Sequence, residues 1–145
     1  MHNPATSLDS LIGYRLKEAQ TLLRSRMDEA LRGFELTTPQ YTCLELLSRT
    51  PGASNSELAR GAFVTRQTMN TLLQSLADRG LVKRAAAPDN GRVLPTTLTP
   101  SGEAILVRAS DAVRAIEAQF VSGLDSDQRQ TLHEYLGVCI AALRG

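Results

Sequence analysis

Two short helical segments joined by a tight turn, with two strand-like segments directly after them, constrain the fold of this chain more than any other feature. The first helix begins with the sequence SNSE at residues 54–57, which fits a capping box, and ends near Gly61. The second begins at Thr65 as its N-cap and ends near Arg79, before Gly80. Two helices arranged in this way follow the helix-turn-helix pattern.

The segments LVKRAAA and RVLPTTL then flank PDNG, whose Asn-Gly pair is a strong signal for a β-hairpin turn. Pro95 has no backbone N–H, so we expect it where the strand ladder needs no donor. A hairpin directly after a helix-turn-helix makes a winged helix, in which the hairpin is the wing. The alternative is an ordinary helical bundle with one hairpin insertion.

Further helices are predicted on both sides of this motif. Leucine, isoleucine and methionine residues keep largely to one stripe over residues 7–33. Thr38 reads as an N-cap followed by Pro39 at the first helical position, and Asp125 with Gln128 caps the last helix. The predicted helices cover residues 7–33, 38–48, 54–61, 65–79, 99–121 and 125–143.

The predicted fold class is mainly α with a small β-hairpin wing, an α+β arrangement in one domain over residues 1–145. Within it we expect a winged helix-turn-helix lobe at about residues 36–99. The helices at about 7–33 and 100–143 lie outside that lobe and are predicted to form a helical dimerisation region. Their apolar positions need a partner surface, because a lone lobe cannot cover them. These positions include Leu106, Val113, Ile116, Phe120, Leu132, Leu136, Val138, Ile140 and Leu143.

The helix predicted at 65–79 has an outer face of uncharged amides and hydroxyls, where an ordinary solvated face carries Lys and Glu. At about 100° per residue, its apolar and its polar side chains lie on opposite sides. The apolar ones are Met69, Leu72, Leu73 and Leu76, and the polar ones are Gln67, Asn70, Thr71 and Gln74. Gln and Asn can bond adenine N6 and N7 together, and Thr can touch a thymine methyl, so this face suits base edges in a DNA major groove. Arg66, in the first turn, can reach a guanine edge or a phosphate.

Basic residues are concentrated around the same motif. Residues 51–99 hold six Lys or Arg against three acidic residues, a net +3, while the whole chain carries +1. Such cations supply affinity by neutralising phosphates, and Arg84 is one of them. Arg92 directly follows the Asn-Gly pair, so it lies at the predicted wing tip. There it can enter a narrow minor groove, where the negative potential is greatest.

Three segments, LTTPQYTCLELL, SNSELARGAFVTRQTMNTLLQSLADRGLVKR and GRVLPTTLTPSG, resemble the MarR family of bacterial winged-helix regulators. The resemblance covers nearly the whole chain. It implies a homodimer with intertwined terminal helices, whose two lobes bind pseudo-palindromic double-stranded DNA. It also implies a transcriptional regulator, typically a repressor that a small-molecule effector such as a phenolic or aromatic acid releases from DNA.

The helix face, the charge and the resemblance together predict a set of DNA-binding residues. They are Arg66, Gln67, Thr68, Asn70, Thr71, Gln74, Arg84 and Arg92. The family wing often reads Asp-x-Arg-Asp-x-Arg, whereas this chain has APDNGR, in which only the final Arg matches. Ala87 and Asn90 occupy the two Asp positions. Because those acids typically brace the wing, we expect a looser wing that gives up more entropy on binding DNA.

The sequence constrains the sensing chemistry less than it constrains DNA binding. Cys43 and Cys139 lie in the apolar segments YTCLELL and GVCIAAL, which favour inert core thiols. A cysteine-based oxidant-sensing regulator is the alternative. The resemblance favours a small-molecule effector between the dimerisation helices and the lobe, with Tyr14, Arg15 and Tyr41 as conceivable contacts.

The sequence argues against an enzyme and against a membrane protein. It contains no Gly-rich phosphate loop, nucleophile elbow or metal-ligand spacing, so we expect neither catalysis nor a metal or other cofactor. No apolar run is long enough for a membrane span and the N-terminus is not signal-like, which predicts a cytoplasmic protein. A helical protein-interaction module without DNA binding is the alternative from another functional class.

Overall fold

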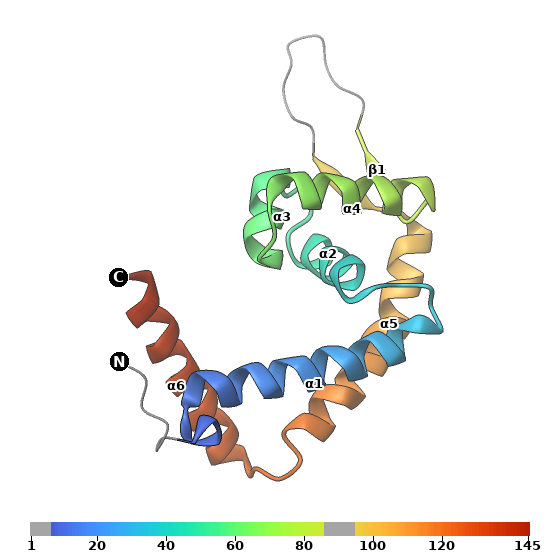
Figure 1. Ribbon diagram of the computed structural model, residues 1–145. Helices are drawn as coiled ribbons and strands as arrows, with labels where there is room; N and C mark the ends of the chain where they lie inside the picture. The colour runs from blue at the N-terminus through green and yellow to red at the C-terminus, as the bar shows by residue number, and fades with distance from the viewer. Residues whose placement is uncertain (1–6, 86–94) are drawn as a thin grey trace.

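The structure of the protein is a computed structural model that describes residues 7–85 and 95–145. The elements in chain order are η1 (Leu8–Ser10), α1 (Ile12–Arg32), α2 (Thr38–Arg49), α3 (Asn55–Ala62), α4 (Arg66–Asp78), β1 (Val82–Arg84), β2 (Thr96–Leu98), α5 (Pro100–Phe120) and α6 (Ser126–Arg144). Figure 1 shows α2, α3 and α4 gathered in one lobe with β1 beside α4, while α1 and the far half of α5 lie beneath that lobe. The predicted fold class, mainly α with one antiparallel hairpin, is confirmed.

The helix predicted over residues 7–33 is divided in two. Leu11 has an extended backbone, with φ −84° and ψ 122°, between η1 and α1. Ser7 Oγ accepts the Asp9 N–H at 3.3 Å, and the Ser7 carbonyl accepts the Ser10 hydroxyl at 2.7 Å. Short polar side chains that bond nearby backbone in this way compete with a regular helix. The prediction of one continuous helix from residue 7 was therefore wrong.

The other helices begin at side-chain caps, as the sequence predicted. Ser54 caps α3 and Thr65 caps α4, each by accepting a backbone N–H on its side chain. α2 begins one position earlier than expected. Its N-cap is Thr37, not Thr38, because Thr37 forms a capping box with Gln40.

The two short strands pair in antiparallel register, with Val82 opposite Leu98. Pro95 directly precedes β2, so it lies outside the paired residues, as predicted. The turn expected at Asn90 and Gly91 lies outside the described residues. β1 follows α4 closely in the chain, which places the hairpin against the end of that helix.

One hydrophobic core holds the lobe together, and α4 contributes its predicted apolar face. Met69, Leu73 and Leu76 are each at most 1% exposed, and Leu72 is partly buried beside them. Their buried neighbours from α1, α2, α3 and the loops include Leu31, Leu36, Cys43, Leu44, Leu47, Ala53, Leu58 and Ala59. Because this face of α4 is buried, the opposite face is turned to solvent.

The part of α5 up to Val113 belongs to the same core. Leu106 is only 6% exposed, and Val113 packs against the core cluster. The prediction that these two residues need a partner surface was therefore wrong. The physical reason is that α5 packs first against α2 and then along α1, so its early turns are covered within the chain.

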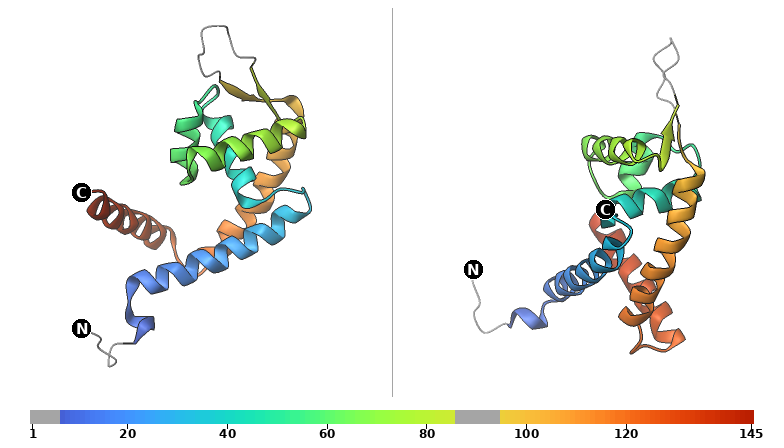
Figure 2. Two further views of the ribbon diagram at one scale, coloured as in Figure 1. Left: turned by 45° about the horizontal axis from the view of Figure 1, so that its top comes forward. Right: turned by 90° about the vertical axis from the view of Figure 1, so that its right-hand side faces the viewer.

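α6, all of which the structure describes, has no buried residue. It extends away from the end of α5, as the two views in Figure 2 show. Leu132, Leu136, Ile140 and Leu143 fall within one stripe at helical spacing and are each at least 37% exposed. The single chain therefore presents a continuous apolar strip on this helix, and strips of this kind mark interfaces.

The loop between α1 and α2 is fastened to the end of α4. Arg79 donates to the carbonyl oxygen of Glu35 at 2.6 Å and to that of Phe34 at 3.3 Å. Glu35 has φ 55°, in the left-handed region. The Arg108 guanidinium lies 5.4 Å from the centroid of the Phe34 ring, within cation–π range. These contacts fix the loop, and hence the end of α1, relative to α4.

The close approach of α5 to Leu81, the residue before β1, can be tested at Gly102. A Cβ on Gly102 would lie 2.0 Å from the Leu81 carbonyl oxygen. We predict that Gly102→Ala lowers the free energy of unfolding by about 1–3 kcal/mol, because the backbone must move. The matched control is Gly33→Ala, which should be neutral or slightly stabilising, since Gly33 has φ −63° and open space around its Cβ position. Urea unfolding measures both, and equal midpoints would contradict the close approach.

Candidate nucleic-acid interface

The predicted polar side chains of α4 are exposed to solvent. The helix lies beside the hairpin strand β1 (Figure 1). Six predicted DNA-binding residues are exposed on this one helix, namely Arg66, Gln67, Thr68, Asn70, Thr71 and Gln74. Arg84 stands at the end of the adjacent strand β1. Arg92, predicted at the wing tip, lies outside the described residues, as do Ala87 and Asn90. We call the exposed side of α4, together with Arg84, the polar face.

Arg84 is bound to the helix. Its Nη2 donates to Asn70 Oδ1 at 2.8 Å, and the residue is half-buried. Because a guanidinium has donors only, Asn70 must turn its amide oxygen to Arg84 and keep its Nδ2 for other partners. Asn70 therefore offers a ligand a donor, whereas the sequence-based expectation had both amide atoms available.

The side-chain amide of Gln74 has the opposite orientation to that of Asn70, because it donates to Asp78, which is not among the predicted DNA-binding residues. Its Nε2 donates to Asp78 Oδ1 at 2.9 Å, one helical turn further on. A carboxylate only accepts, so Gln74 must turn its nitrogen to Asp78, which leaves Oε1 for a ligand. The signal for Asp78 in the sequence was its i, i+4 spacing from Gln74 on one helix face.

The two predicted threonines are partly engaged within α4 itself. Thr71 Oγ1 donates to the Gln67 carbonyl at 3.2 Å. Thr68 Oγ1 lies 3.0 Å from the hydroxyl of the cap residue Thr65. The hydroxyl proton of Thr71 is therefore used, and its methyl group and oxygen lone pairs remain for contacts with a base edge.

Polar contacts outside the core also anchor α4. Gln40 Nε2 of α2 donates to Ser75 Oγ at 3.1 Å, and the Ser75 hydroxyl donates to the Leu72 carbonyl at 2.8 Å. With the Arg79 contacts at its end, α4 is fixed to α2 and to the α1–α2 loop. The position of the polar face therefore depends on these neighbours.

A hollow of about 390 Å³ lies where α1, the start of α2 and the α3–α4 turn meet, and we call it the inter-helix hollow. Its lining consists of Gln20, Leu23, Arg24, Met27, Thr38, Pro39, Thr42, Ala62, Phe63 and Val64. Phe63 adopts a left-handed conformation, with φ 59° and ψ 39°, and is 86% exposed. That conformation costs about 1–2 kcal/mol for an L-residue, and such strain is found at functional sites.

Arg24 supplies the positive charge in the lining of the inter-helix hollow. Its Nε lies 3.3 Å from Asp28 Oδ1, in a pair whose two side chains are each somewhat less than half exposed. The hydrogen bond from the Thr38 hydroxyl, together with the nearby positive charge of Arg24, holds the pKa of Asp28 below its ordinary value of 3.8. Asp28 is therefore a carboxylate at neutral pH, and it orients Arg24 while joining α1 to the start of α2.

The residues considered from the sequence as effector contacts do not line this hollow. Tyr41 is 8% exposed, and its hydroxyl lies 3.3 Å from Ser110 Oγ on α5. Tyr14 and Arg15 are exposed on an earlier turn of α1. The Tyr41 hydroxyl thus joins α2 to α5 within the chain. No periodic pattern in the sequence indicates the hollow, because its walls come from segments far apart in the chain.

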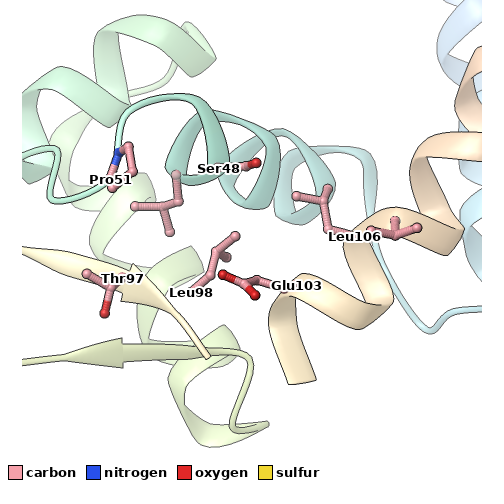
Figure 3. A pocket seen from close by; sticks show the side chains of 8 residues that line it. Ser48, Pro51, Thr97, Leu98, Glu103 and Leu106 are labelled. Carbon is pink, nitrogen blue, oxygen red and sulfur yellow. The ribbon is translucent and has the colours of Figure 1, made fainter. Parts of the chain in front are cut away.

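A second hollow, of about 370 Å³, lies between the end of α2, β2 and the first turns of α5 (Figure 3). Leu47, Leu98 and Leu106 form apolar walls, and the Glu103 carboxylate lies among them. It shares no residue with α4, so it is separate from the polar face.

The two cysteines lie in different settings. Cys43 is buried, and its thiol lies 3.2 Å from the Met69 sulfur. Burial raises the pKa of Cys43 to about 12, so this residue is a protonated thiol, in keeping with the expectation of an inert core residue. Cys139 is exposed on α6. The expectation of a core thiol there was wrong for the single chain, because α6 contributes nothing to the core.

Two further observations apply to the described residues alone. In that part of the chain, no group of three or more His, Cys, Asp or Glu side chains is placed to hold a metal ion. None of the helices in the same part is both long and apolar enough to cross a membrane.

The fold and the polar face define a winged helix-turn-helix protein. A family model for the MarR family matches residues 34–93. The HTH-type transcriptional repressor Rv2887 of Mycobacterium tuberculosis (strain ATCC 25618 / H37Rv) is 42% identical over 128 residues, which cover 88% of this chain and 92% of that repressor. The chain therefore belongs to the MarR family.

Solved structures of Rv2887 are similar to this chain as well. The complex of Rv2887 with DNA has a TM-score of 0.73 at 39% identity, covering 90% of this chain and 98% of that one. The complex of Rv2887 with salicylic acid has a TM-score of 0.71 at 41% identity, covering 90% and 97%. The family resemblance and the winged-helix fold predicted from the sequence are confirmed.

The setting of Cys43 leads to a prediction about thiol chemistry. In a Cys139→Ser variant, where Cys43 is the remaining thiol, we predict that iodoacetamide at pH 8 labels the folded protein at least about 100-fold more slowly than the urea-unfolded chain. The reason is that a raised pKa keeps the thiol protonated at that pH and burial blocks access. Mass spectrometry of timed samples measures the two rates. Equal rates would contradict the assignment and revive oxidant sensing through Cys43.

Proposed function

We propose that this protein is a sequence-specific double-stranded DNA-binding transcriptional repressor that a small aromatic acid releases from its operator. The observation that carries the proposal is the polar face of α4, the second helix of the helix-turn-helix, with β1 directly beside it. Donors and acceptors without net charge suit base edges in a major groove. The relative Rv2887, itself a transcriptional repressor, has been solved in complex with DNA and with salicylic acid, which supports the proposal.

The proposed DNA contacts divide into two groups. Gln67, Asn70, Thr71 and Gln74 face base edges, and Thr68 flanks them. Arg66, at the exposed start of α4, contacts a phosphate or a guanine edge, because the N-terminal residues of a recognition helix approach the groove most closely. On sequence grounds, Arg92 enters the adjacent minor groove.

The active form is proposed to be a homodimer. The apolar strip on α6 is exposed in the single chain, and so are Ile12, Leu16 and Leu22 on α1, at 81%, 52% and 62%. A second copy of the chain covers both sets if residues of about 7–33 and 100–143 form the dimer interface. Two-fold symmetry then presents one α4 to each half-site of a pseudo-palindromic operator, about one helical turn apart.

The effector is proposed to occupy the inter-helix hollow. Leu23, Met27 and Val64 can pack on an aromatic ring, and the Arg24 guanidinium can pair with its carboxylate. The hollow, of about 390 Å³, falls within the size range of small-molecule sites. Phe63 and Val64 directly precede the cap residue Thr65, so a ligand that binds against them can displace the start of α4. A shift there moves the polar face and weakens DNA binding.

The proposed role is non-catalytic and cytoplasmic, and the similarity to the transcriptional repressor Rv2887 supports it. The oxidant-sensing alternative is less well supported at Cys43, which is buried and protonated, and it would have to use Cys139, which is exposed on α6. The protein-interaction alternative gives no account of the uncharged amide face on α4.

Gel retardation tests the DNA-binding and effector proposals together. We predict that the wild-type protein retards a duplex selected from a random pool far more than a scrambled duplex at the same salt, and that salicylate reverses this. Arg24→Ala should bind the selected duplex normally but resist release, while Arg15→Ala, a loss of the same charge outside the hollow, should be released normally. Failure of the wild-type to prefer any duplex would favour the interaction module. If salicylate released Arg24→Ala from DNA as readily as the wild-type, the proposed effector site would be contradicted, but the DNA-binding proposal would not.

Sedimentation equilibrium tests the dimer. We predict that the wild-type sediments as twice its 15.7 kDa chain mass at low micromolar concentration. Leu136→Glu should dissociate, unfold or aggregate, because a charge then lies within the apolar strip of α6. The control Gln130→Lys adds a charge on the other side of α6, where it can pair with Glu134, and should remain a dimer. A well-folded wild-type monomer would rule out the dimer.

A further inference from the structure

We propose that Arg84 and Asp78 are positioning residues that set the base preference of α4. Each fixes one amide, so that Asn70 recognises an acceptor on a base edge and Gln74 recognises a donor. The inference rests on the proposed DNA binding and specifies it further: it assigns the chemical class of the bases that each half-site presents to these two residues.

The Asn70 amide has one permitted orientation while Arg84 stays in place. Arg84 belongs to the strand ladder, where it pairs with Thr96, which is 4% exposed, so its backbone is fixed. Its bond to Asn70 Oδ1, at 2.8 Å, is charge-assisted and therefore stronger than a bond between two neutral groups. Rotating the amide would set donor against donor. Asn70 thus presents its Nδ2 to the groove.

The Gln74 amide is fixed in the reverse orientation by a charge of the opposite sign. Asp78 accepts from Gln74 Nε2 at 2.9 Å, and a carboxylate has no donor with which to accommodate a rotated amide. Both residues lie on α4 one turn apart, so no movement of another element breaks this bond. Gln74 thus presents its Oε1 to the groove.

The two orientations select different bases. In the major groove, a lone donor suits guanine, with acceptors at N7 and O6, and thymine O4. Adenine suits it less, because its N7 acceptor lies beside the N6 amino group, which is itself a donor. A lone acceptor suits adenine N6 and cytosine N4. Asn70 and Gln74 are about 6 Å apart along the helix at 1.5 Å per residue, which places them over nearby base pairs. The half-site should therefore offer guanine or thymine to Asn70 and adenine or cytosine to Gln74. A two-bond contact from Asn70 to adenine would require Arg84 to leave.

The competing role for Arg84 is a simple phosphate contact. A phosphate contact carries no sequence information, so its loss weakens all duplexes alike. A positioning role instead changes which base is preferred at one operator position. Lys83 provides the matched control. It is exposed on the same strand and has the same charge and a similar length, but its side chain points to the other face of the hairpin.

The experiment measures base preference with the full-length protein. An operator is first selected from random duplexes, and the affinity of every single-base substitution is then measured for each variant. Asn70→Ala and Gln74→Ala identify the two positions, as those where preference disappears. In the wild-type we expect guanine or thymine to be favoured about tenfold at the Asn70 position, and adenine or cytosine by a similar factor at the Gln74 position.

The positioning variants are then compared at those two positions. Arg84→Met should reduce the preference at the Asn70 position to about twofold, whereas Lys83→Met should change the affinity for all duplexes by the same factor, if at all, and keep every preference. Asp78→Asn is isosteric and can donate or accept, so it should relax the preference at the Gln74 position only. Asn70→Asp keeps the bond to Arg84 but offers no donor, and should favour cytosine or adenine instead.

Three results would overturn the inference: adenine favoured by the wild-type at the Asn70 position, an Arg84→Met profile that matches Lys83→Met, or an Asn70→Asp variant that still prefers guanine or thymine. The first and last results leave Arg84 untouched, so together they test the orientation of the Asn70 amide even if Arg84→Met fails to fold. A wild-type protein that selects no duplex at all would overturn the DNA-binding proposal itself. That outcome is distinct from selecting an operator with the wrong bases.

Discussion

The burial of Met69, Leu73 and Leu76 against α2 is the interaction on which the remaining structure depends. Each such side chain contributes about 1.5–3 kcal/mol when fully removed from water, so the three together fix the roll of α4 about its own axis. A roll of one residue, about 100°, would bury Asn70 or Gln74 and expose leucine instead. The position of every amide on the polar face therefore follows from apolar contacts on the opposite side of the helix.

That burial also brings α4 within reach of polar groups from three other segments. Gln40 reaches Ser75 from α2, Arg84 reaches Asn70 from β1, and Arg79 reaches the α1–α2 loop. Each of these bonds crosses between elements, and none could form if α4 were rolled or displaced. The core thus determines where α4 lies, and the polar bonds determine how its surface groups are oriented. The inter-helix hollow meets this assembly at the turn that precedes Thr65.

Most features set by neighbours in the chain could be predicted, whereas features set by contacts across the fold could not. Two local features were missed, the break at Leu11 and the cap at Thr37, because several Ser and Thr side chains there offer competing caps. The caps at Ser54 and Thr65 and the apolar face of α4 are local, and all were predicted. The burial of Leu106 was missed because the leucine pattern of α5 is the same whether the cover is α2 or a partner chain. The exposure of Cys139 was missed for the same reason. The orientation of the Asn70 amide was also missed, since it depends on a residue fourteen positions away across a strand.

The contact of Arg79 with the α1–α2 loop has a consequence for operator geometry. α1 belongs to the proposed dimer interface, and the Arg79 contacts join the end of α4 to the loop after α1. The distance and the angle between the two α4 helices of the dimer are therefore fixed. One extra base pair between half-sites shifts them by about 3.4 Å and rotates them by roughly 35° about the DNA axis. If a flexible loop joined α1 to the rest of the lobe, the two α4 helices could move to follow that change. In this protein, two bonds from Arg79 to backbone carbonyls, at 2.6 and 3.3 Å, hold that loop, so the helices tolerate little change in spacing. The spacing of the half-sites thus becomes part of what the protein recognises.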